Sequence, residues 1–378
     1  MNPNFSSRPF LSVIIPTRER AETLRYAIAT ALDQTSDAFE VIVSDNFSQD
    51  DTKDVVHSFG DRRLKYINTQ RRVSMCDNWE FALEHATGEY VIFIGDDDAV
   101  MPGALDRLLE TIAQTACEVV YTWPVPLYTW PMDGQHACVQ IPPKVTSTFE
   151  IDLKRRARHV VSMGTWRWSR LPSTYHSAVS RRILDAISTQ SGRVFHSTQP
   201  DVFTAMAIPV FANRAISVEY RVTVNGHSQK SNGGASIAKA GAAVRDRFIR
   251  EYGSYNLHHT LFPEIPLIAN LEADTVLVAM DLFPQFYSQM KFNYDAMWAC
   301  IWRSAPIYGW KIMPLEIIRK GREIRRYHTF NVAHFLFWVA IHQVAAWRRR
   351  ILTRTMNLKS FAEHTPDNIR DFVKQLSL

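Results

Sequence analysis

The chain has 378 residues, of which 46% are hydrophobic and 21% are charged. That apolar content supplies a sizeable core and excludes a disordered chain, while the length suggests two domains rather than one. The formal net charge of +5 is small, but arginine is dense at 319–326 and 348–354, so most of the positive charge lies in the C-terminal region. No run reaches the roughly 18 uninterrupted apolar residues of a membrane-spanning helix, and we expect no N-terminal signal peptide.

The first part of the chain alternates short apolar runs with helical patterns. We predict strands at 11–16, 40–44, 64–67, 90–94 and 118–122, and helices between them at 21–32, 52–59, 75–85 and 105–116. This alternation is typical of βαβ units and therefore of an α/β fold with a mostly parallel sheet flanked by helices. Such a sheet places its loops, and with them its ligand, along one edge.

The region that follows is less regular. Residues 124–143 are rich in Pro, Trp and Tyr, which indicates an irregular excursion rather than another βαβ unit. One more strand is predicted at 219–224, ending at Asn225-Gly226, and 228–234 is a polar, Gly-containing lid or linker. We therefore expect the first domain to comprise residues 1–234.

Beyond residue 235 the sequence pattern is mostly helical. Helices are predicted at 238–252, 267–287, 294–303, 316–325 and 332–352. Residues 235–378 are therefore expected to form a mainly α-helical C-terminal domain.

Three consecutive aspartates, Asp96, Asp97 and Asp98, follow the apolar run at 90–94 and one glycine. The run is typical of a buried strand, so the acids stand at its carboxyl end, where α/β sheets bind ligands. Adjacent carboxylates repel one another unless a cation lies among them, and oxygen ligands favour Mg²⁺ or Mn²⁺ over zinc. The alternative is that these aspartates cap the helix predicted to begin near Pro102.

Polar side chains also end two of the earlier predicted strands. They are Pro16, Thr17, Arg18 and Glu19 at the end of the first strand, and Asp45 and Asn46 after the strand at 40–44. A carboxylate and an amide at a strand end are able to pair with the edge of a nucleobase. Three polar strand ends at the spacing of successive βαβ units converge on one crevice, which is a more specific signal than any single motif.

The order and spacing of three segments carry a resemblance to a known family. The segments are Ser12-Val-Ile-Ile-Pro-Thr-Arg, then Val41-Ile-Val-Ser-Asp-Asn-Phe-Ser-Gln-Asp-Asp-Thr, and then Asn78-Trp with Ala86-Thr-Gly-Glu-Tyr-Val-Ile-Phe-Ile-Gly-Asp-Asp-Asp. Together they resemble the nucleotide-sugar domain of family 2 glycosyltransferases, which have the Rossmann-like GT-A fold. The resemblance is strong over about residues 10–115, weaker to about 230 and absent from the helical C-terminal part.

The resemblance implies a nucleoside diphosphate sugar as donor, with a UDP-sugar favoured. In that family the acid after the second strand, here Asp45, pairs with the base, and the first acid of the cluster, here Asp96, lies near the ribose. The other residues assigned to the donor pocket are Pro16, Thr17, Arg18, Glu19, Asn46, Asn78 and Asp97. Trp79, beside Asn78, has a simpler interpretation as a packing residue with Leu83.

The resemblance also implies a divalent metal, Mn²⁺ or Mg²⁺, with Asp98 as its expected ligand. Many relatives carry an acid or a histidine where this chain has Gly95, so Asp97 and Asp98 both remain candidates. His227 follows the last predicted strand, at a position where some relatives place a histidine near the diphosphate or the metal; a structural role is the alternative. Arg221 and Lys230 are further candidates for meeting the phosphates.

An inverting transfer needs a general base within hydrogen-bond reach of the acceptor hydroxyl. Asp201 occupies the place where relatives carry their catalytic acid before a helix, although an aspartate after proline at a helix start is also an ordinary N-cap. We therefore predict a metal-dependent inverting glycosyltransferase of cell-surface polysaccharide or glycoconjugate biosynthesis. The alternative is a non-catalytic nucleotide-sugar-binding scaffold, which has no need to keep mutually repelling acids together.

The expected partners are the donor and a saccharide or lipid-linked acceptor, without nucleic acid, and homo-oligomer formation is left open. The four cysteines lack metal-ligand spacing and secreted-scaffold density, which favours the cytoplasm. The apolar stretch 335–347, followed by Arg348-Arg349-Arg350, predicts either a membrane-surface element or the core of a helical domain, and His334 and His342 favour the core. In the first case the protein is peripheral at the inner face of the cytoplasmic membrane.

Overall fold

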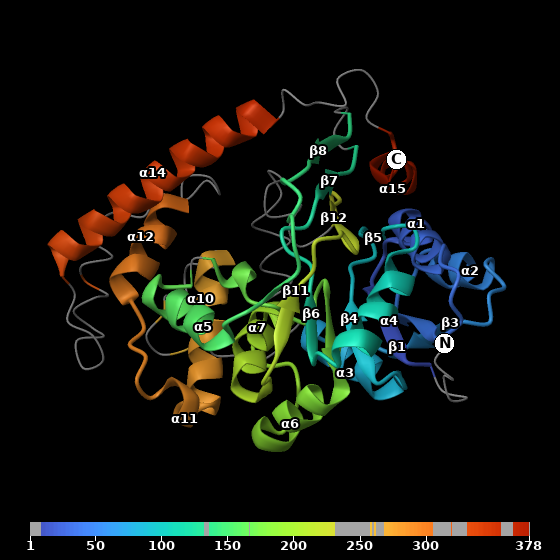
Figure 1. Ribbon diagram of the computed structural model, residues 1–378, viewed down its shortest axis with the longest axis horizontal. Helices are drawn as coiled ribbons and strands as arrows, with labels where there is room; N and C mark the ends of the chain where they lie inside the picture. Colours follow the sequence, from blue (N-terminus) through green and yellow to red (C-terminus); the bar gives the residue numbers. More distant parts are fainter. Residues whose placement is uncertain are drawn as a thin grey trace.

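The computed structural model describes residues 9–131, 136–165, 167–230, 258, 261, 268–304, 319, 331–356 and 366–377. An eight-stranded sheet in the order β3-β2-β1-β4-β10-β6-β11-β9 lies at its centre. Helices cover both faces of this sheet, and a four-stranded sheet in the order β5-β12-β7-β8 lies above one end of it (Figure 1).

The elements have the following bounds. The large sheet contains β1 (Leu11–Thr17), β2 (Phe39–Asp45), β3 (Leu64–Asn68), β4 (Tyr90–Phe93), β6 (Val119–Tyr121), β9 (Phe149–Glu150), β10 (Ser177–Ser180) and β11 (Ala215–Ser217). The small sheet contains β5 (Ala99–Val100), β7 (Leu127–Thr129), β8 (Cys138–Gln140) and β12 (Thr223–His227). The helices are α1 (Ala21–Leu32), α2 (Thr52–His57), α3 (Met75–His85), α4 (Ala104–Thr115), α5 (Leu153–Ser162), the 3₁₀ turn η1 (Trp168–Arg170), α6 (Arg181–Ser191), α7 (Pro200–Phe211), α10 (Ile268–Leu282), α11 (Pro284–Tyr287), α12 (Tyr294–Ser304), α14 (Val332–Met356) and α15 (Ile369–Ser377).

Four parallel strands, β3, β2, β1 and β4, form the half of the large sheet that the sequence pattern predicts. Their apolar residues alternate between the two faces: Leu11, Val13 and Ile15 belong to the core under α1 and α4, whereas Ile14 belongs to the core on the opposite face. Both cores are needed because a parallel sheet is covered on both sides. The predicted α/β fold class is therefore confirmed.

The less regular region contains more strand than the sequence predicts. Residues 124–143 contribute β7 and β8, which pair with each other in antiparallel fashion. The prediction of an irregular excursion at 124–143 is therefore wrong. The strand expected at 219–224 is observed at Thr223–His227, and Asn225 and Gly226 lie inside it rather than ending it. Parallel pairing with β7, which joins Gly226 to Tyr128, extends the strand past the glycine.

The described helices of the C-terminal part pack into the same cores as the sheet. Ala273 and Val276 of α10 and Trp298 of α12 are buried in one cluster with Phe203 of α7. Helix α15 lies against α1 and β5, where Phe372 is fully buried beside Tyr128 and Tyr128 Oη donates to the Pro366 carbonyl at 2.7 Å.

The helical character predicted beyond residue 235 is confirmed for these described helices. The helices predicted at 238–252 and 316–325 lie outside the described residues, apart from residue 319, and the domain boundary after residue 234 stays a prediction. In the part of the chain that the structure describes, no helix has both the length and the apolar content that crossing a membrane requires.

Candidate active site

Side chains from the ends of three neighbouring parallel strands meet at one edge of the large sheet. Thr17 stands opposite Asp45 in the register of β1 and β2, and Asp45 stands opposite Asn68 of β3. The three aspartates that follow β4 lie beside this row, because Thr17 Oγ1 donates to Asp96 Oδ2 at 2.6 Å. The predicted convergence of polar strand ends is thus present in the structure.

Asp96 is bound by the segment that follows β1. Its Oδ1 lies 2.9 Å from Arg20 Nη1, and the Arg18 backbone N–H also donates to the carboxylate. Burial raises the pKa of Asp96, and the charge of Arg20 opposes that shift. A cation therefore does lie among the repelling acids, but Arg20 of the protein itself supplies it. The persistence of the acidic cluster consequently does not by itself require a metal.

Asp98 is fully buried and its oxygens are held by the protein. Its Oδ2 accepts from the Gly95 backbone N at 2.5 Å and from Tyr175 Oη at 2.7 Å, and its Oδ1 accepts from the Gly226 backbone N at 2.6 Å. Burial, aided by the neighbouring charge of Asp97, raises the pKa of Asp98. Asp98 thus fastens the strands around the site to one another.

Asp97 differs from its two neighbours in what it contacts. Among the described residues its carboxylate accepts one hydrogen bond, from the Ser228 backbone N to Oδ2 at 2.9 Å, and Oδ1 lies 3.8 Å from Arg20 Nη1. His227 is close to it: burial lowers the pKa of that histidine and the charge of Asp97 opposes the shift. Asp97 is therefore the acid of the cluster with acceptor capacity left for a ligand.

The alternative that these aspartates cap the next helix is wrong. Helix α4 begins at Ala104, and its N-cap is Gly103, which contributes no side-chain hydrogen bond. The sequence placed the helix start correctly within a few residues, but the left-handed φ of 64° at Gly103 turns the chain into the helix without an acidic cap.

A metal ion held by three or more protein side chains is not part of this arrangement. Within the described ranges, no group of three or more His, Cys, Asp and Glu side chains is placed to hold a metal. Mg²⁺ is commonly bound by one or two carboxylates with waters and substrate phosphates as its other ligands. Asp97 and His227 supply one carboxylate and one imidazole that could hold such an ion, which is fewer side chains than a complete protein-made metal site has.

Gly226 is where β12 crosses the acidic cluster. A Cβ at this position would stand 1.7 Å from the Asp97 carbonyl oxygen, which is backbone and cannot swing away. We expect Gly226→Ala to push β12 off the cluster, break the bond to Asp98, and lower the free energy of unfolding by about 2 kcal/mol or more. Thermal unfolding measures this effect, and an unchanged melting temperature would contradict the packing of β12 on Asp97.

Asp45 lies in a network at the ends of β2 and β3. Its Oδ2 accepts from Tyr66 Oη at 2.7 Å and from Asn68 Nδ2 at 2.9 Å, while Oδ1 accepts from the Ser48 backbone N at 2.9 Å. Burial and the bond to Asp45 raise the pKa of Tyr66 to about 12. Glu19 joins the network from the β1 side, because its backbone N–H donates to Ser48 Oγ at 2.8 Å, and its carboxylate forms an ion pair with Arg72.

The two candidate asparagines make bonds within the protein. Asn46 bridges to Val73, with Nδ2 donating to the carbonyl and Oδ1 accepting from the N–H, both at 2.9 Å. Asn78 is buried under β2, where its Oδ1 accepts from Ser44 Oγ at 2.7 Å. Trp79 stacks on Phe93 at 4.3 Å between ring centroids, as the packing interpretation predicts.

Asp201 lies in the first turn of α7, one residue after Pro200. It is not the N-cap, because that position belongs to Gln199. Burial raises the pKa of Asp201 to about 6, although backbone N–H groups of Asp201 and Val202 favour its charged form. The charge of Asp201 contributes to the raised pKa of Tyr175, the residue that donates to Asp98, so Asp201 lies in electrostatic reach of the acidic cluster.

Several residues of this site are not expected from the sequence. His176 has a left-handed φ of 63°, its Nδ1 lies 2.9 Å from Thr223 Oγ1, and burial lowers its pKa to about 3, so it is neutral. Glu272 of α10 accepts from Trp168 Nε1 at 2.8 Å, and burial, with a further contribution from Asp201, raises its pKa to about 7. Their sequence surroundings contain no strand-end pattern. Only tertiary packing brings these residues to the site, so the sequence does not predict them.

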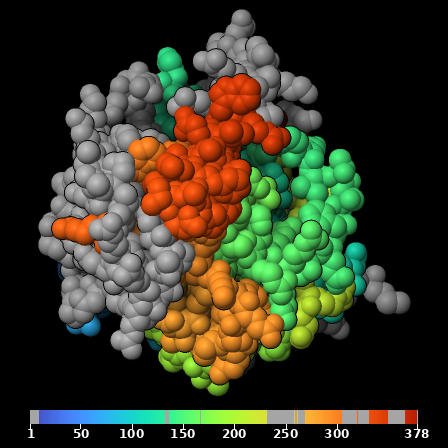
Figure 2. Space-filling view, turned by 90° about the vertical axis from the view of Figure 1, so that its left-hand side faces the viewer, coloured from blue at the N-terminus to red at the C-terminus, as the bar shows by residue number. Residues whose placement is uncertain are grey.

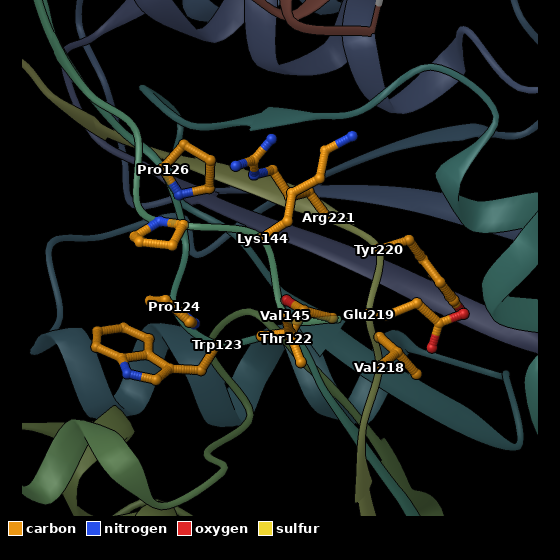
Figure 3. A pocket seen from close by; sticks show the side chains of 11 residues that line it. Thr122, Trp123, Pro124, Pro126, Lys144, Val145, Val218, Glu219, Tyr220 and Arg221 are labelled. Atoms are coloured by element: carbon orange, nitrogen blue, oxygen red, sulfur yellow. The ribbon is translucent and has the colours of Figure 1, made fainter. Parts of the chain in front are cut away.

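The two candidate phosphate-binding groups, Arg221 and Lys230, line different hollows. A cavity of about 460 Å³ lies beside the acidic cluster, with Arg20, Ser228 and Lys230 in its wall. Lys230 Nζ also donates to the Glu19 carbonyl at 3.4 Å. Arg221 instead lines a smaller hollow at the ends of β6 and β11, where its guanidinium donates to the Pro142 carbonyl at 2.8 Å (Figure 3).

Residues 12–159 match the family described as Glycosyl transferase family 2. This match confirms the resemblance found in the sequence, and this part of the chain is a family 2 glycosyltransferase domain. The range contains the strand ends and the acidic cluster of the site, whereas Asp201, Gly226 and Glu272 lie beyond it.

Two proteins with similar sequences are named as beta-1,3-glucosyltransferases. The GalNAc(5)-diNAcBac-PP-undecaprenol beta-1,3-glucosyltransferase of Campylobacter jejuni is 41% identical over 105 residues, which is 27% of this chain and 34% of that protein. The UDP-Glc:alpha-D-GlcNAc-diphosphoundecaprenol beta-1,3-glucosyltransferase of Escherichia coli is 25% identical over 111 residues, which is 29% of this chain and 44% of that protein. The chain therefore spans between a third and a half of the length of these relatives.

Solved structures show a weaker likeness. The S. aureus TarS 1-349 structure in complex with UDP is 14% identical, covers 89% of this chain and 91% of that chain, and has a TM-score of 0.47.

Proposed function

We propose that the chain transfers a sugar from a nucleoside diphosphate sugar, with a UDP-sugar favoured, to an acceptor hydroxyl with inversion at the anomeric carbon. The observation that carries this proposal is the convergence of Thr17, Asp45 and the acidic cluster at one sheet edge, with Asp201 in electrostatic reach. Polar groups gathered at the carboxyl ends of parallel strands are the usual ligand site of such sheets.

The donor nucleotide is proposed to lie along the ends of β1 and β2. Pro16, Thr17, Arg18 and Glu19 form one wall. Asp45 accepts a hydrogen bond from the base at the fourth acceptor position of its carboxylate, since Tyr66, Asn68 and Ser48 occupy the other three. Asp96, fixed by Thr17 and Arg20, faces the ribose. Asn46 and Asn78 act on the pocket indirectly, because their bonds to Val73 and Ser44 hold its walls in place.

Asp97, with His227, is proposed to hold a divalent ion, Mn²⁺ or Mg²⁺, together with the donor diphosphate. Such an ion stabilises the negative charge that grows on the leaving diphosphate. Asp98 remains a candidate ligand from the sequence, but its oxygens already accept from Gly95, Gly226 and Tyr175, which supports a role in fixing the site.

Asp201 is proposed as the general base. Its carboxylate takes the proton of the acceptor hydroxyl while that oxygen forms a bond to the anomeric carbon and the bond from that carbon to the diphosphate breaks. With a pKa of about 6, Asp201 is ionised at neutral pH and still basic enough to share a proton in the transition state. Glu272 and Trp168, from outside the family match, line the side of the site next to this base.

The acceptor is proposed to be a saccharide, free or linked to a lipid, in polysaccharide or glycoconjugate assembly. Two similar proteins carry names that place their acceptors on undecaprenol diphosphates. Residues 1–234 are proposed as the catalytic domain and 235–378 as the helical domain that completes it. A cytoplasmic protein at the inner face of the membrane suits such an acceptor, and a homo-oligomer is compatible with it.

The experiment that tests this function is calorimetric titration of UDP and of GDP into the protein, with Mn²⁺ and with a chelator. We expect one of the two nucleotides to bind in the presence of the metal and its affinity to fall when the metal is removed. Release of the nucleoside diphosphate from the matching sugar donor then tests turnover. Failure of both nucleotides to bind would contradict the proposal, and binding without any turnover of donor would favour a scaffold.

A further inference from the structure

Helix α14 has an outer face that is apolar and exposed. Leu336 is 57% exposed, Phe337 and Val344 are each 55% exposed, and Trp347 is 64% exposed. These positions recur at the spacing of one helix face, and the helix lies across the outside of the molecule in Figure 2. A helix of a globular protein normally turns polar residues outwards, so this face calls for a ligand or partner.

The opposite face of α14 fixes the helix in this orientation. Phe335 is buried in the core, and His342 is buried with its Nε2 3.3 Å from the Ala296 carbonyl of α12. His334 Nδ1 lies 2.8 Å from Asp295 Oδ2, also on α12. His342 therefore lies on the packed side of the helix, whereas His334 is exposed although it contacts Asp295. Leu336 and Phe337, between the two histidines, face outwards.

Basic side chains adjoin the exposed end of this face. Burial lowers the pKa of Arg167, and the charges of Arg170 and of Arg348, next to Trp347, lower it further. Burial also lowers the pKa of His159 on α5, and the charges of Arg167, Arg170 and Arg155 add to that shift. Like charges that affect one another in this way lie close together. The sequence of α14 contains no acidic residue, and arginines also stand at 349, 350 and 354.

We propose that this surface, defined by Leu336, Phe337, Val344 and Trp347 of α14 with Arg155, Arg167, Arg170 and Arg348, docks on an anionic lipid bilayer. The apolar side chains enter the boundary between headgroups and acyl chains, and the arginines pair with lipid phosphates. A second copy of the chain would place its own arginines against these arginines, and α14 has no acidic residue to pair with them. The positive charge therefore favours an anionic lipid surface over a second copy. The proposal goes beyond the proposed transfer reaction and does not depend on it.

The position of the surface has a consequence for the site. Arg170 ends η1, and Trp168 of the same turn donates to Glu272, the neighbour of the proposed base. A bilayer that meets this surface therefore lies on the side from which Glu272 and Trp168 border the site.

Co-sedimentation of the full chain with vesicles tests the proposal. We compare phosphatidylcholine vesicles with vesicles that also contain phosphatidylglycerol, and we expect binding to the anionic vesicles that weakens as salt is raised. The double variant Phe337→Gln/Trp347→Gln should lose about tenfold or more of this affinity, whereas Phe337→Leu/Trp347→Phe should retain most of it. Arg155→Gln/Arg170→Gln, at two exposed arginines of this surface, should lose about tenfold or more.

A matched charge control is Lys53→Gln/Arg62→Gln, which removes two exposed cations from α2 and the loop before β3 and should leave binding unchanged. No sedimentation of the unmodified protein, or equal binding to neutral vesicles, would overturn the proposal. So would a concentration-dependent dimer that Phe337→Gln/Trp347→Gln dissociates, because a second copy would then cover the face. Nucleotide binding measured on the same variants separates this outcome from failure of the proposed function.

Discussion

Asp201→Asn is expected to lower the rate of sugar transfer by about a hundredfold to ten-thousandfold and to leave the affinity for the donor nearly unchanged. The amide keeps the size of the side chain but cannot take a proton from the acceptor hydroxyl. Release of nucleoside diphosphate in the presence of acceptor measures the rate, and titration of the nucleotide measures the affinity. The matched control is Asp185→Asn on α6, which changes an exposed carboxylate and should not alter either quantity.

The pH dependence of transfer follows from the same residue. Asp201 is protonated below its pKa of about 6, so kcat is expected to fall as the pH drops through that value.

The contribution of Asp201 to stability depends on pH in the opposite direction. The unfolded chain releases this proton near 3.8 and the folded chain near 6, so stability declines as pH rises between these values. Asp201→Asn should therefore raise the melting temperature above pH 6 and change it little at pH 4. Full activity of the variant would remove Asp201 from the role of base.

The second large effect is expected at Asp97. Asp97→Ala should weaken metal-dependent nucleotide binding by about a hundredfold or more, because it removes the carboxylate that has acceptor capacity left for the ion. The free energy of unfolding should fall only slightly, because among the described residues the Asp97 carboxylate accepts one hydrogen bond, from the Ser228 backbone N. Calorimetric titration with Mn²⁺ and with chelator measures the first effect, and denaturant unfolding measures the second.

Asp98→Ala is expected to affect mainly the stability of the fold, in contrast to Asp97→Ala. It leaves the N–H groups of Gly95 and Gly226 and the hydroxyl of Tyr175 without their buried acceptor, and we expect it to cost about 3 kcal/mol or more of unfolding free energy. If Asp98→Ala instead keeps its stability and loses only the metal-dependent binding, while Asp97→Ala retains that binding, the metal ligand is Asp98.

The sequence predicts the donor half of the site because its information is local. Each polar group there directly follows an apolar strand, and parallel strands bring such ends to one edge, so Thr17, Asp45 and Asp96 could be placed together before the fold was known. Arg20 was within the same stretch, but its pairing with Asp96 depends on how the chain turns into α1.

The other half of the site depends on contacts between distant segments. Tyr175, His176 and Glu272 carry no strand-end or helix-cap pattern, and they reach the acids because β10, α7 and α10 pack behind them. The short strands β7 and β8 were missed for a related reason. Proline and tryptophan in that region suggest a loop, yet pairing with β12 imposes an extended backbone on it.

Helix α15 has a consequence for how the protein is made. Ile369, Phe372 and Val373 fill the core under α1, whose other members come from strands and helices that leave the ribosome much earlier. Between the synthesis of β12 and that of α15, on the order of ten seconds at usual elongation rates, this apolar surface has no cover from α15. Newly made chains should therefore be bound by chaperones during that interval, and stalling translation before residue 369 should prolong that binding.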